Sequence, residues 1–139
     1  MVSKVLVAMD DSAMAERALE FALDAYPEAA ITVAHVVGVP SPFMVEVAEL
    51  ALADDIEDTA NARAEVVFER ARAIADEFGV PITTVVEIGH PSRAIVGLAP
   101  AFDVVVVGSH GRNLLSRILL GNVAERIVRR SPVPVTVVR

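Results

Sequence analysis

The chain has 139 residues, 54% of them hydrophobic and 22% charged, which indicates one globular domain over residues 1–139 rather than a disordered segment. A net charge of −7 and an aromatic content of only 4% argue against partners such as nucleic acid or an anionic membrane. No apolar run reaches the roughly 18 residues of a membrane span. No cysteine is present, and the first residues lack the layout of a secretory signal, so we expect a cytoplasmic protein.

The first half of the chain alternates apolar runs with helical periodicity. Val5–Met9 predicts a strand, and apolar residues at three- and four-residue spacings after it predict a helix. Ile31–Val37 predicts a second strand. The Ala-, Glu- and Arg-rich stretch from about Met44 to Phe78 predicts a long helix, which the acidic cluster Asp54–Asp58 either interrupts or restarts. This half therefore contributes two strands and at least two helices.

The second half continues the same alternation. We expect strands at Ile82–Ile88, Val104–Gly108 and Val135–Val138. Helices are expected from His90 to near Pro100 and from about Gly121 to Arg130, ranges bounded by proline and glycine. Five strands in strict alternation with helices predict an α/β fold, a single open parallel sheet with helices on both faces.

Strand composition indicates which strands are central. The first and fourth strands are uniformly apolar, as strands buried on both faces should be. The third carries Thr83, Thr84 and Glu87, and the fifth is entered through Pro134, so both suit edges. If the first and fourth strands are neighbours, a crevice opens at their carboxyl ends, where open α/β sheets bind ligands. Asp10 and Gly108 would then form its two lips.

A glycine-rich loop follows the fourth strand. Gly108 permits a sharp turn, and Gly111 permits a close approach of backbone to a ligand. Gly121 and Asn122 open a helix, whose unpaired N–H groups and dipole favour an anion. The loop has neither the Walker A ending nor the Rossmann spacing. The residues alone leave two interpretations open, a phosphate cradle and a set of turn glycines.

The combined pattern resembles the ATP-binding type of universal stress protein over the whole chain. The spacing Gly-x-x-Gly, nine residues, then Gly and a small polar residue is the nucleotide signature of that family, met here by Gly108, Gly111 and Gly121. Further matches are Asp10, the pair His35-Val36, Gly89-x-Pro91 and the closing segment 131–135. The resemblance implies a five-stranded parallel sheet of order 3-2-1-4-5, a fold of the adenine nucleotide alpha hydrolase type.

The resemblance also implies a ligand, ATP or a related adenine nucleotide, with or without Mg²⁺. Asp10 would bind the adenosine moiety, Ala8 and Met9 would line its pocket, and Val36 would pack near the adenine. Ribose and phosphates would be surrounded by Gly108, Gly111, Gly121, Asn122 and Val123. Two residues depart from the family pattern: Asn122 replaces a Ser or Thr, and Met9 is bulkier than the small residue often found there.

Other polar residues have simpler interpretations. Ser12 or Asp11 is expected to cap the helix that follows, which leaves Asp10 for the crevice. Arg112 beside the glycine loop could contact outer phosphates or point to solvent. The spacing of His35, His90 and His110 is typical of loop histidines rather than of a metal site. No catalytic residues are expected: the chain offers no dedicated general base or phosphate-gripping lysine, so at most slow ATP hydrolysis is predicted.

Two classes of function remain open. One is a nucleotide-binding regulatory module of the stress response, and the other is a homodimeric interaction protein whose loop no longer binds nucleotide. The intact glycines favour the first, and Asn122 favours the second. Either form is expected to dimerise through the last strand, with Val135 and Val137 at the contact, because an open apolar edge is a liability unless it is paired. The alternative contact is the apolar segment Met44–Ala53.

Overall fold

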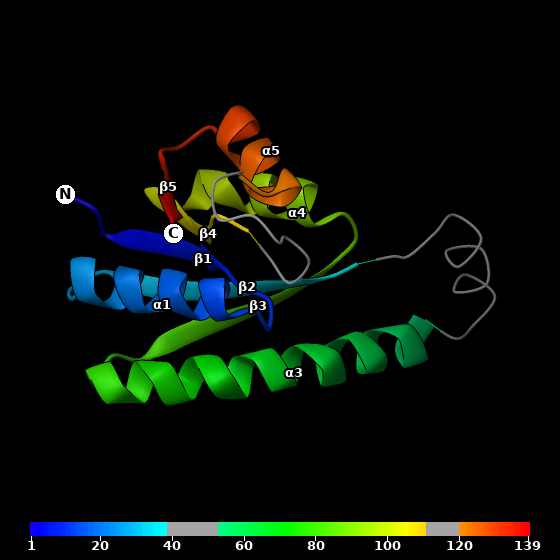
Figure 1. Ribbon diagram of the computed structural model, residues 1–139. Helices are drawn as coiled ribbons and strands as arrows, with labels where there is room; N and C mark the ends of the chain where they lie inside the picture. The colour runs from blue at the N-terminus through cyan, green and yellow to red at the C-terminus, as the bar shows by residue number, and fades with distance from the viewer. Residues whose placement is uncertain (39–52, 111–119) are drawn as a thin grey trace.

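The computed structural model describes residues 1–38, 53–110 and 120–139, and these contain one five-stranded sheet (Figure 1). Every neighbouring pair of strands is parallel, and the order is β3-β2-β1-β4-β5. The strands are β1 (Lys4–Ala8), β2 (Ala30–Val37), β3 (Ile82–Ile88), β4 (Val104–Gly108) and β5 (Val135–Val138). The predicted fold class, strand order and edge strands are therefore confirmed.

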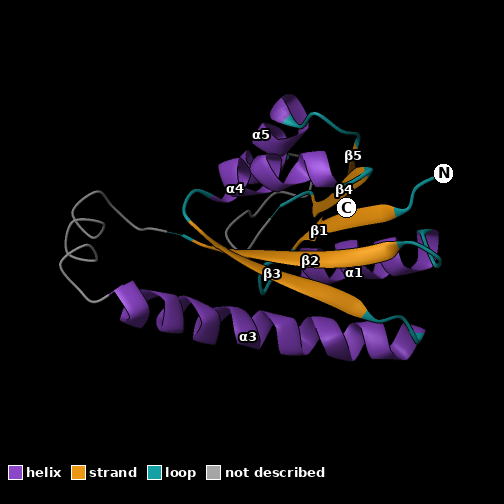
Figure 2. Ribbon diagram, turned by 180° about the vertical axis from the view of Figure 1, so that it is seen from behind, coloured by secondary structure: helices purple, strands orange, loops and turns teal. Residues whose placement is uncertain are grey.

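Helices cover both faces of the sheet (Figures 1 and 2). One face carries α1 (Ala13–Ala25) and α3 (Ala53–Phe78), and the other carries α4 (Pro91–Leu98) and α5 (Asn122–Arg130). A short 3-10 turn, η1 (Ala99–Ala101), follows α4. No helix in the described part of the chain is both long and apolar enough to cross a membrane.

Two hydrophobic cores, one on each side of the sheet, hold these layers together. Val5 and Val7 of β1 are fully buried against the α1 and α3 side, and Leu6 between them is fully buried against the α4 and α5 side. Successive residues of a strand point to opposite faces, so a central strand must be apolar at every position. Residues 104–107 of β4 are buried in the same way. This is why composition alone identified the central strands.

Several element boundaries differ from the sequence prediction. β1 ends at Ala8 rather than Met9, although the Met9 N–H still donates to the Ala34 carbonyl at 2.9 Å. Gly121 is the extended N-cap of α5 and not its first helical residue. The helix expected to end near Pro100 divides into α4 and η1.

The long helix expected from about Met44 is described only from residue 53 onward. α3 begins at Ala53 and continues without a break to Phe78, and its predicted start at Met44 lies outside the described residues. The acidic cluster 54–58 falls at the N-terminus of this helix. Negative charge is favourable near a helix N-terminus because of the helix dipole, and the described helix runs through the cluster without interruption.

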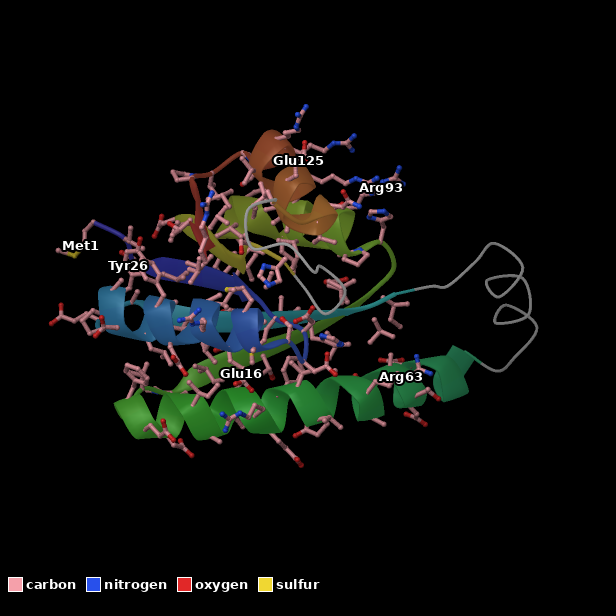
Figure 3. All side chains as sticks on the ribbon, in the orientation of Figure 1. Met1, Glu16, Tyr26, Arg63, Arg93 and Glu125 are labelled. Atoms are coloured by element: carbon pink, nitrogen blue, oxygen red, sulfur yellow. The ribbon has the colours of Figure 1, made fainter. Side chains whose placement is uncertain are left out.

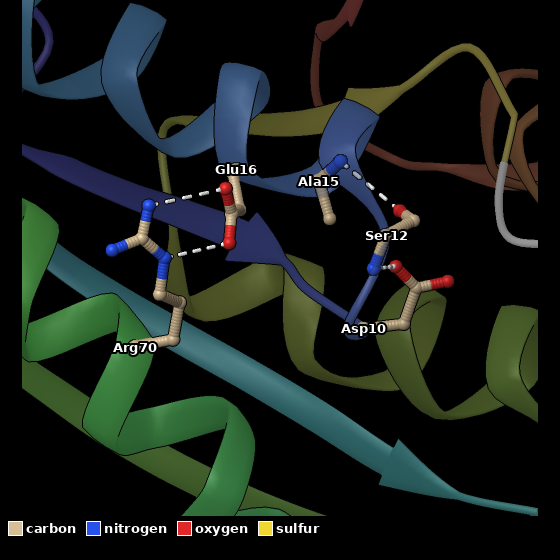
Figure 4. A network of polar contacts seen from close by, with 5 residues as sticks. All are labelled: Asp10, Ser12, Ala15, Glu16 and Arg70. Atoms are coloured by element: carbon tan, nitrogen blue, oxygen red, sulfur yellow. Dashed lines mark hydrogen bonds and ion pairs between the residues drawn. The ribbon is translucent and has the colours of Figure 1, made fainter.

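Two polar contacts tie separate elements together. The Arg70 Nε of α3 donates to Glu16 Oε1 of α1 at 2.7 Å (Figure 4), and Glu16 is also labelled in Figure 3. Asp103, just before β4, accepts the N–H groups of Ser3 and Lys4 through Oδ2 at 2.8 and 2.9 Å. These two backbone donors stabilise the carboxylate and lower the pKa of Asp103. The contact fixes the start of β1 beside β4.

Candidate functional site

A cavity of about 450 Å³ opens at the carboxyl ends of β1, β2 and β4, where the starts of α4 and α5 also meet. Asp10 lines one side and Gly108 the other. The helix that follows β1 and the helix that follows β4 lie on opposite faces of the sheet. The strand order therefore changes direction between β1 and β4. Ligands of open α/β sheets bind at this topological switch point. The cavity thus lies at the edge where the sequence places a crevice.

Asp10 is held in place by the start of α1 (Figure 4). Ser12 is the N-cap, and its Oγ accepts the Ala15 N–H at 3.1 Å, as expected for one of the two capping candidates. The Ser12 N–H donates to Asp10 Oδ1 at 2.9 Å. Asp10 is half-buried and lines the cavity. The carboxylate is therefore positioned by a backbone turn.

Gly108 and Gly121 are required by close packing. A Cβ on Gly108 would lie 2.9 Å from Met14 Cγ and 3.0 Å from the Met14 carbonyl oxygen on α1. A Cβ on Gly121 would lie 3.1 Å from His110 Cα and 3.2 Å from the Ser109 carbonyl oxygen. Neither glycine has a positive φ. Their function is thus to bring the loop backbone against α1 and against the start of α5.

The start of α5 presents backbone donors to the cavity. The Gly121 N–H is already used, because it donates to the Ser109 carbonyl at 2.6 Å, so it is not one of the unpaired donors that the sequence suggested. The first helical hydrogen bond runs from the Glu125 N–H to the Gly121 carbonyl. The N–H groups of residues 122–124 precede it and have no acceptor one turn earlier in the helix. These three donors, with the helix dipole, favour an anion.

Three histidines lie at this edge of the sheet. His35 Nδ1 bonds to the Met9 carbonyl at 2.8 Å, and His110 Nδ1 bonds to Ser109 Oγ at 3.1 Å; both histidines line the cavity. His90 instead bonds to Ser92 and to Arg126 and does not line it. Among the described residues, no three His, Asp or Glu side chains come together as a metal site.

The structure brings most of the predicted site residues to one cavity. Eight of them line it: Ala8, Met9, Asp10, Val36, Gly108, Gly121, Asn122 and Val123. Gly111 and Arg112 lie outside the described residues. Met9 is only 4% exposed and packs in the core beneath α1 and α3, so this core accommodates much of its bulk.

Sequence reasoning missed about half of the lining. The additional residues are Ser12, Ala15, Ala34, His35, Pro91, Ile95, Val107, His110 and Ala124. His35 and His110 carried a signal, because both follow predicted strands at the ligand-binding edge. Ile95 and Ala15 carried none, since apolar helix residues facing a cavity have the same periodicity as those facing a core.

Comparison with known proteins places this site in a family. The sequence profile of the universal stress protein family matches residues 1–139. Universal stress protein YxiE of Bacillus subtilis is 30% identical, with all of both chains covered. The chain spans about half the length of the mycobacterial universal stress proteins that it matches.

Solved structures agree in fold along almost the entire chain. The structure of MJ0577 from Methanocaldococcus jannaschii superposes with a TM-score of 0.78 at 27% identity and covers 99% of this chain and 96% of its own. A universal stress protein in complex with cAMP gives a TM-score of 0.74 at 26% identity, covering 99% and 97%. The chain therefore belongs to the universal stress protein family.

Proposed function

We propose that this domain binds an adenine nucleotide, with ATP as the expected ligand, in the cavity at the carboxyl ends of β1 and β4. The observation that carries the proposal is the pairing, in one cavity, of the Asp10 carboxylate with the donor-rich start of α5. These two groups suit the two polar parts of a nucleotide, the ribose hydroxyls and the phosphates. The similar universal stress protein solved with cAMP supports this choice of ligand class.

Each part of the cavity wall suits one part of the ligand. Ala8, Val36 and Ile95 provide apolar surface against which a purine ring can pack. The Asp10 carboxylate can accept hydrogen bonds from ribose hydroxyls. The backbone donors at the start of α5 can receive phosphate oxygens. A volume of about 450 Å³ falls within the range of roughly 300–1,000 Å³ that is usual for small-molecule sites.

The domain would act as a regulatory module whose partners respond to the bound nucleotide. No lysine lines the cavity, so its described wall lacks the phosphate-gripping lysine used in fast phosphoryl transfer. Any Mg²⁺ would be carried mainly by phosphate oxygens and water, as is usual for this ion. Placement in the cytoplasm, which composition suggested, remains part of the proposal.

Substitution of Asn122 tests the proposed nucleotide binding. It is exposed at the first position of α5 and lines the cavity, where its amide can donate to a phosphate oxygen in place of the hydroxyl usual in the family. A hydrogen bond to a charged group contributes about 1.5–3 kcal/mol, so Asn122→Ala should weaken ATP binding about ten-fold or more. Adenosine binding should change far less, and Asn122→Ser should preserve or improve ATP affinity. Calorimetry with ATP and adenosine measures all three.

A second candidate function is an interaction protein that binds no nucleotide. It is favoured by the Gly121 N–H, which the Ser109 carbonyl occupies and which is thereby lost to a phosphate. Mass spectrometry of small molecules released from the denatured, purified protein discriminates between the two. If neither the parent nor Asn122→Ser carries or binds any nucleotide, the interaction protein is the correct function. If Asn122→Ala binds ATP as tightly as the parent, Asn122 is not a ligand.

A further inference from the structure

The charges of this chain are separated along the sequence. Residues 1–90 contain seventeen Asp and Glu but five Lys and Arg, whereas residues 91–139 contain two Asp and Glu and seven Arg. The first segment supplies α1 and α3, and the second supplies α4 and α5, which cover the opposite face of the sheet (Figure 3). The described helices α4 and α5 carry four arginines, Arg93, Arg126, Arg129 and Arg130, and one acidic residue, Glu125. Although the whole protein is acidic, an anion near the starts of α4 and α5 therefore meets a basic layer.

One arginine of this layer, Arg126, contacts a residue that adjoins the cavity wall. Arg126 lies one helical turn after Asn122, so the two share a face of α5, and helix side chains lean toward the N-terminus. The Arg126 Nη1 group lies 3.0 Å from His90 Nε2. His90 directly precedes Pro91, which lines the cavity. The guanidinium thus bridges α5 and the N-cap of α4, next to the cavity-lining Pro91.

His90 holds this arginine without cancelling its charge. A guanidinium can only donate, so His90 Nε2 must be the acceptor, and its proton then resides on Nδ1. The Nδ1–H in turn donates to Ser92 Oγ at 3.1 Å, and Ser92 is buried. Arg129, by contrast, pairs with Glu125 at 3.0 Å. Arg126 is thus oriented by a neutral partner and keeps its full positive charge.

We propose that Arg126, positioned by His90 next to the cavity-lining Pro91, contacts the outer phosphates and selects charged nucleotides over the neutral nucleoside. The inference rests on the proposed nucleotide function and assigns it a specificity-determining residue. Asp10 and the start of α5 line the cavity, and Arg126 lies one helical turn beyond the cavity-lining Asn122, so a phosphate chain that extends past Asn122 would reach it. Because Arg126 is exposed, its attraction for phosphate is screened by salt.

The test compares Arg126→Gln with Arg130→Gln. Both variants remove one positive charge from the same face of α5, but Arg130 is one turn farther from the cavity. ATP affinity should fall about ten-fold in Arg126→Gln and about two-fold or less in Arg130→Gln, with adenosine affinity unchanged in both. The difference should shrink between ionic strengths of about 0.01 M and about 0.15 M. Arg126→Lys, which keeps the charge, should recover most of the ATP affinity.

The outcomes separate this inference from the proposed function. Equal losses of ATP affinity in Arg126→Gln and Arg130→Gln would show that only the overall charge matters and would overturn it. An equal loss of adenosine affinity in Arg126→Gln would overturn it as well. His90→Ala should lower ATP affinity by less than Arg126→Gln does. Adding His90→Ala to Arg126→Gln should lower ATP affinity no further than Arg126→Gln alone. If the parent binds neither ATP nor adenosine, the proposed function fails and this inference fails with it.

Discussion

Gly108 and Gly97 differ in whether their surroundings leave room for a side chain. Gly108 is buried at the end of β4, and the atoms nearest to its missing side chain include the Met14 backbone of α1. Backbone cannot move aside as a flexible side chain can. Gly97 is exposed in α4, and an added Cβ there meets nothing within 4 Å. Of these two glycines, packing requires only Gly108.

Alanine at these two positions should therefore have opposite effects. Gly108→Ala should lower the free energy of unfolding by about 1–3 kcal/mol through overpacking against α1. Gly97→Ala, the matched control, should raise it by about 0.5–1 kcal/mol because alanine favours a helix. Urea denaturation of both variants measures the difference. A Gly108→Ala protein as stable as the parent would mean that α1 can move away from β4.

At the scale of the element, β1 and β4 are joined at their ends by different means. The switch-point end is held by the strand ladder, in which Ala8 pairs with Val107, and the other end by Asp103, whose carboxylate accepts the N–H groups of Ser3 and Lys4. The Asp103 N–H also donates to the Lys4 carbonyl at 2.9 Å. This second end is exposed, so the contact depends on the charge of the carboxylate.

The stability that Asp103 contributes should depend on pH. Its folded-state pKa is lowered below the ordinary 3.8, so the contribution is fully present above about that pH and is lost as the pH falls through the folded-state value. Asp103→Asn removes the titrating group. The free energy of unfolding of the parent should thus approach that of the variant at low pH and exceed it at pH 7. A constant difference between parent and variant at every pH would contradict this account.

At the scale of the whole molecule, β5 leaves one edge of the sheet open among the described elements. The Val105 N–H donates to the Pro134 carbonyl, and the Ser109 N–H to the Val138 carbonyl. In a parallel ladder, alternate residues bond to the same neighbour, so the backbone groups of Val135 and Val137 point outward. An outward apolar edge of this kind favours pairing with a second copy about a two-fold axis.

We predict that the protein is a homodimer joined through β5. Val137→Pro removes an outward N–H while sparing the bonds to β4, so it should convert the dimer to a monomer and leave the domain folded. Light scattering at micromolar concentration, with circular dichroism as the folding control, tests this. A dimer that survives the substitution would point to another contact, such as the segment Met44–Ala53, of which residues 44–52 lie outside the described residues.

Sequence periodicity and composition were sufficient to predict the fold class and the central and edge strands, whereas the full strand order was implied by the family resemblance. β4 is apolar at four successive positions and therefore had to be central, whereas the polar residues of β3 required an edge. The helices and strands alternate, and right-handed connections between parallel strands leave few other arrangements. The same patterns located the ligand edge, because the carboxyl ends of parallel strands all point one way.

Only the tertiary structure decided which residues share the cavity and which donors remain available. Ser12, Ile95 and His110 come from separate elements, and no spacing along the chain records that they meet. The Gly121 N–H counted as a free donor in the sequence, yet a carbonyl twelve residues earlier occupies it. The contact between Arg126 and His90 likewise depends on how α5 packs against α4. Sequence pattern reports local periodicity, whereas these contacts arise from packing between elements that are distant in the chain.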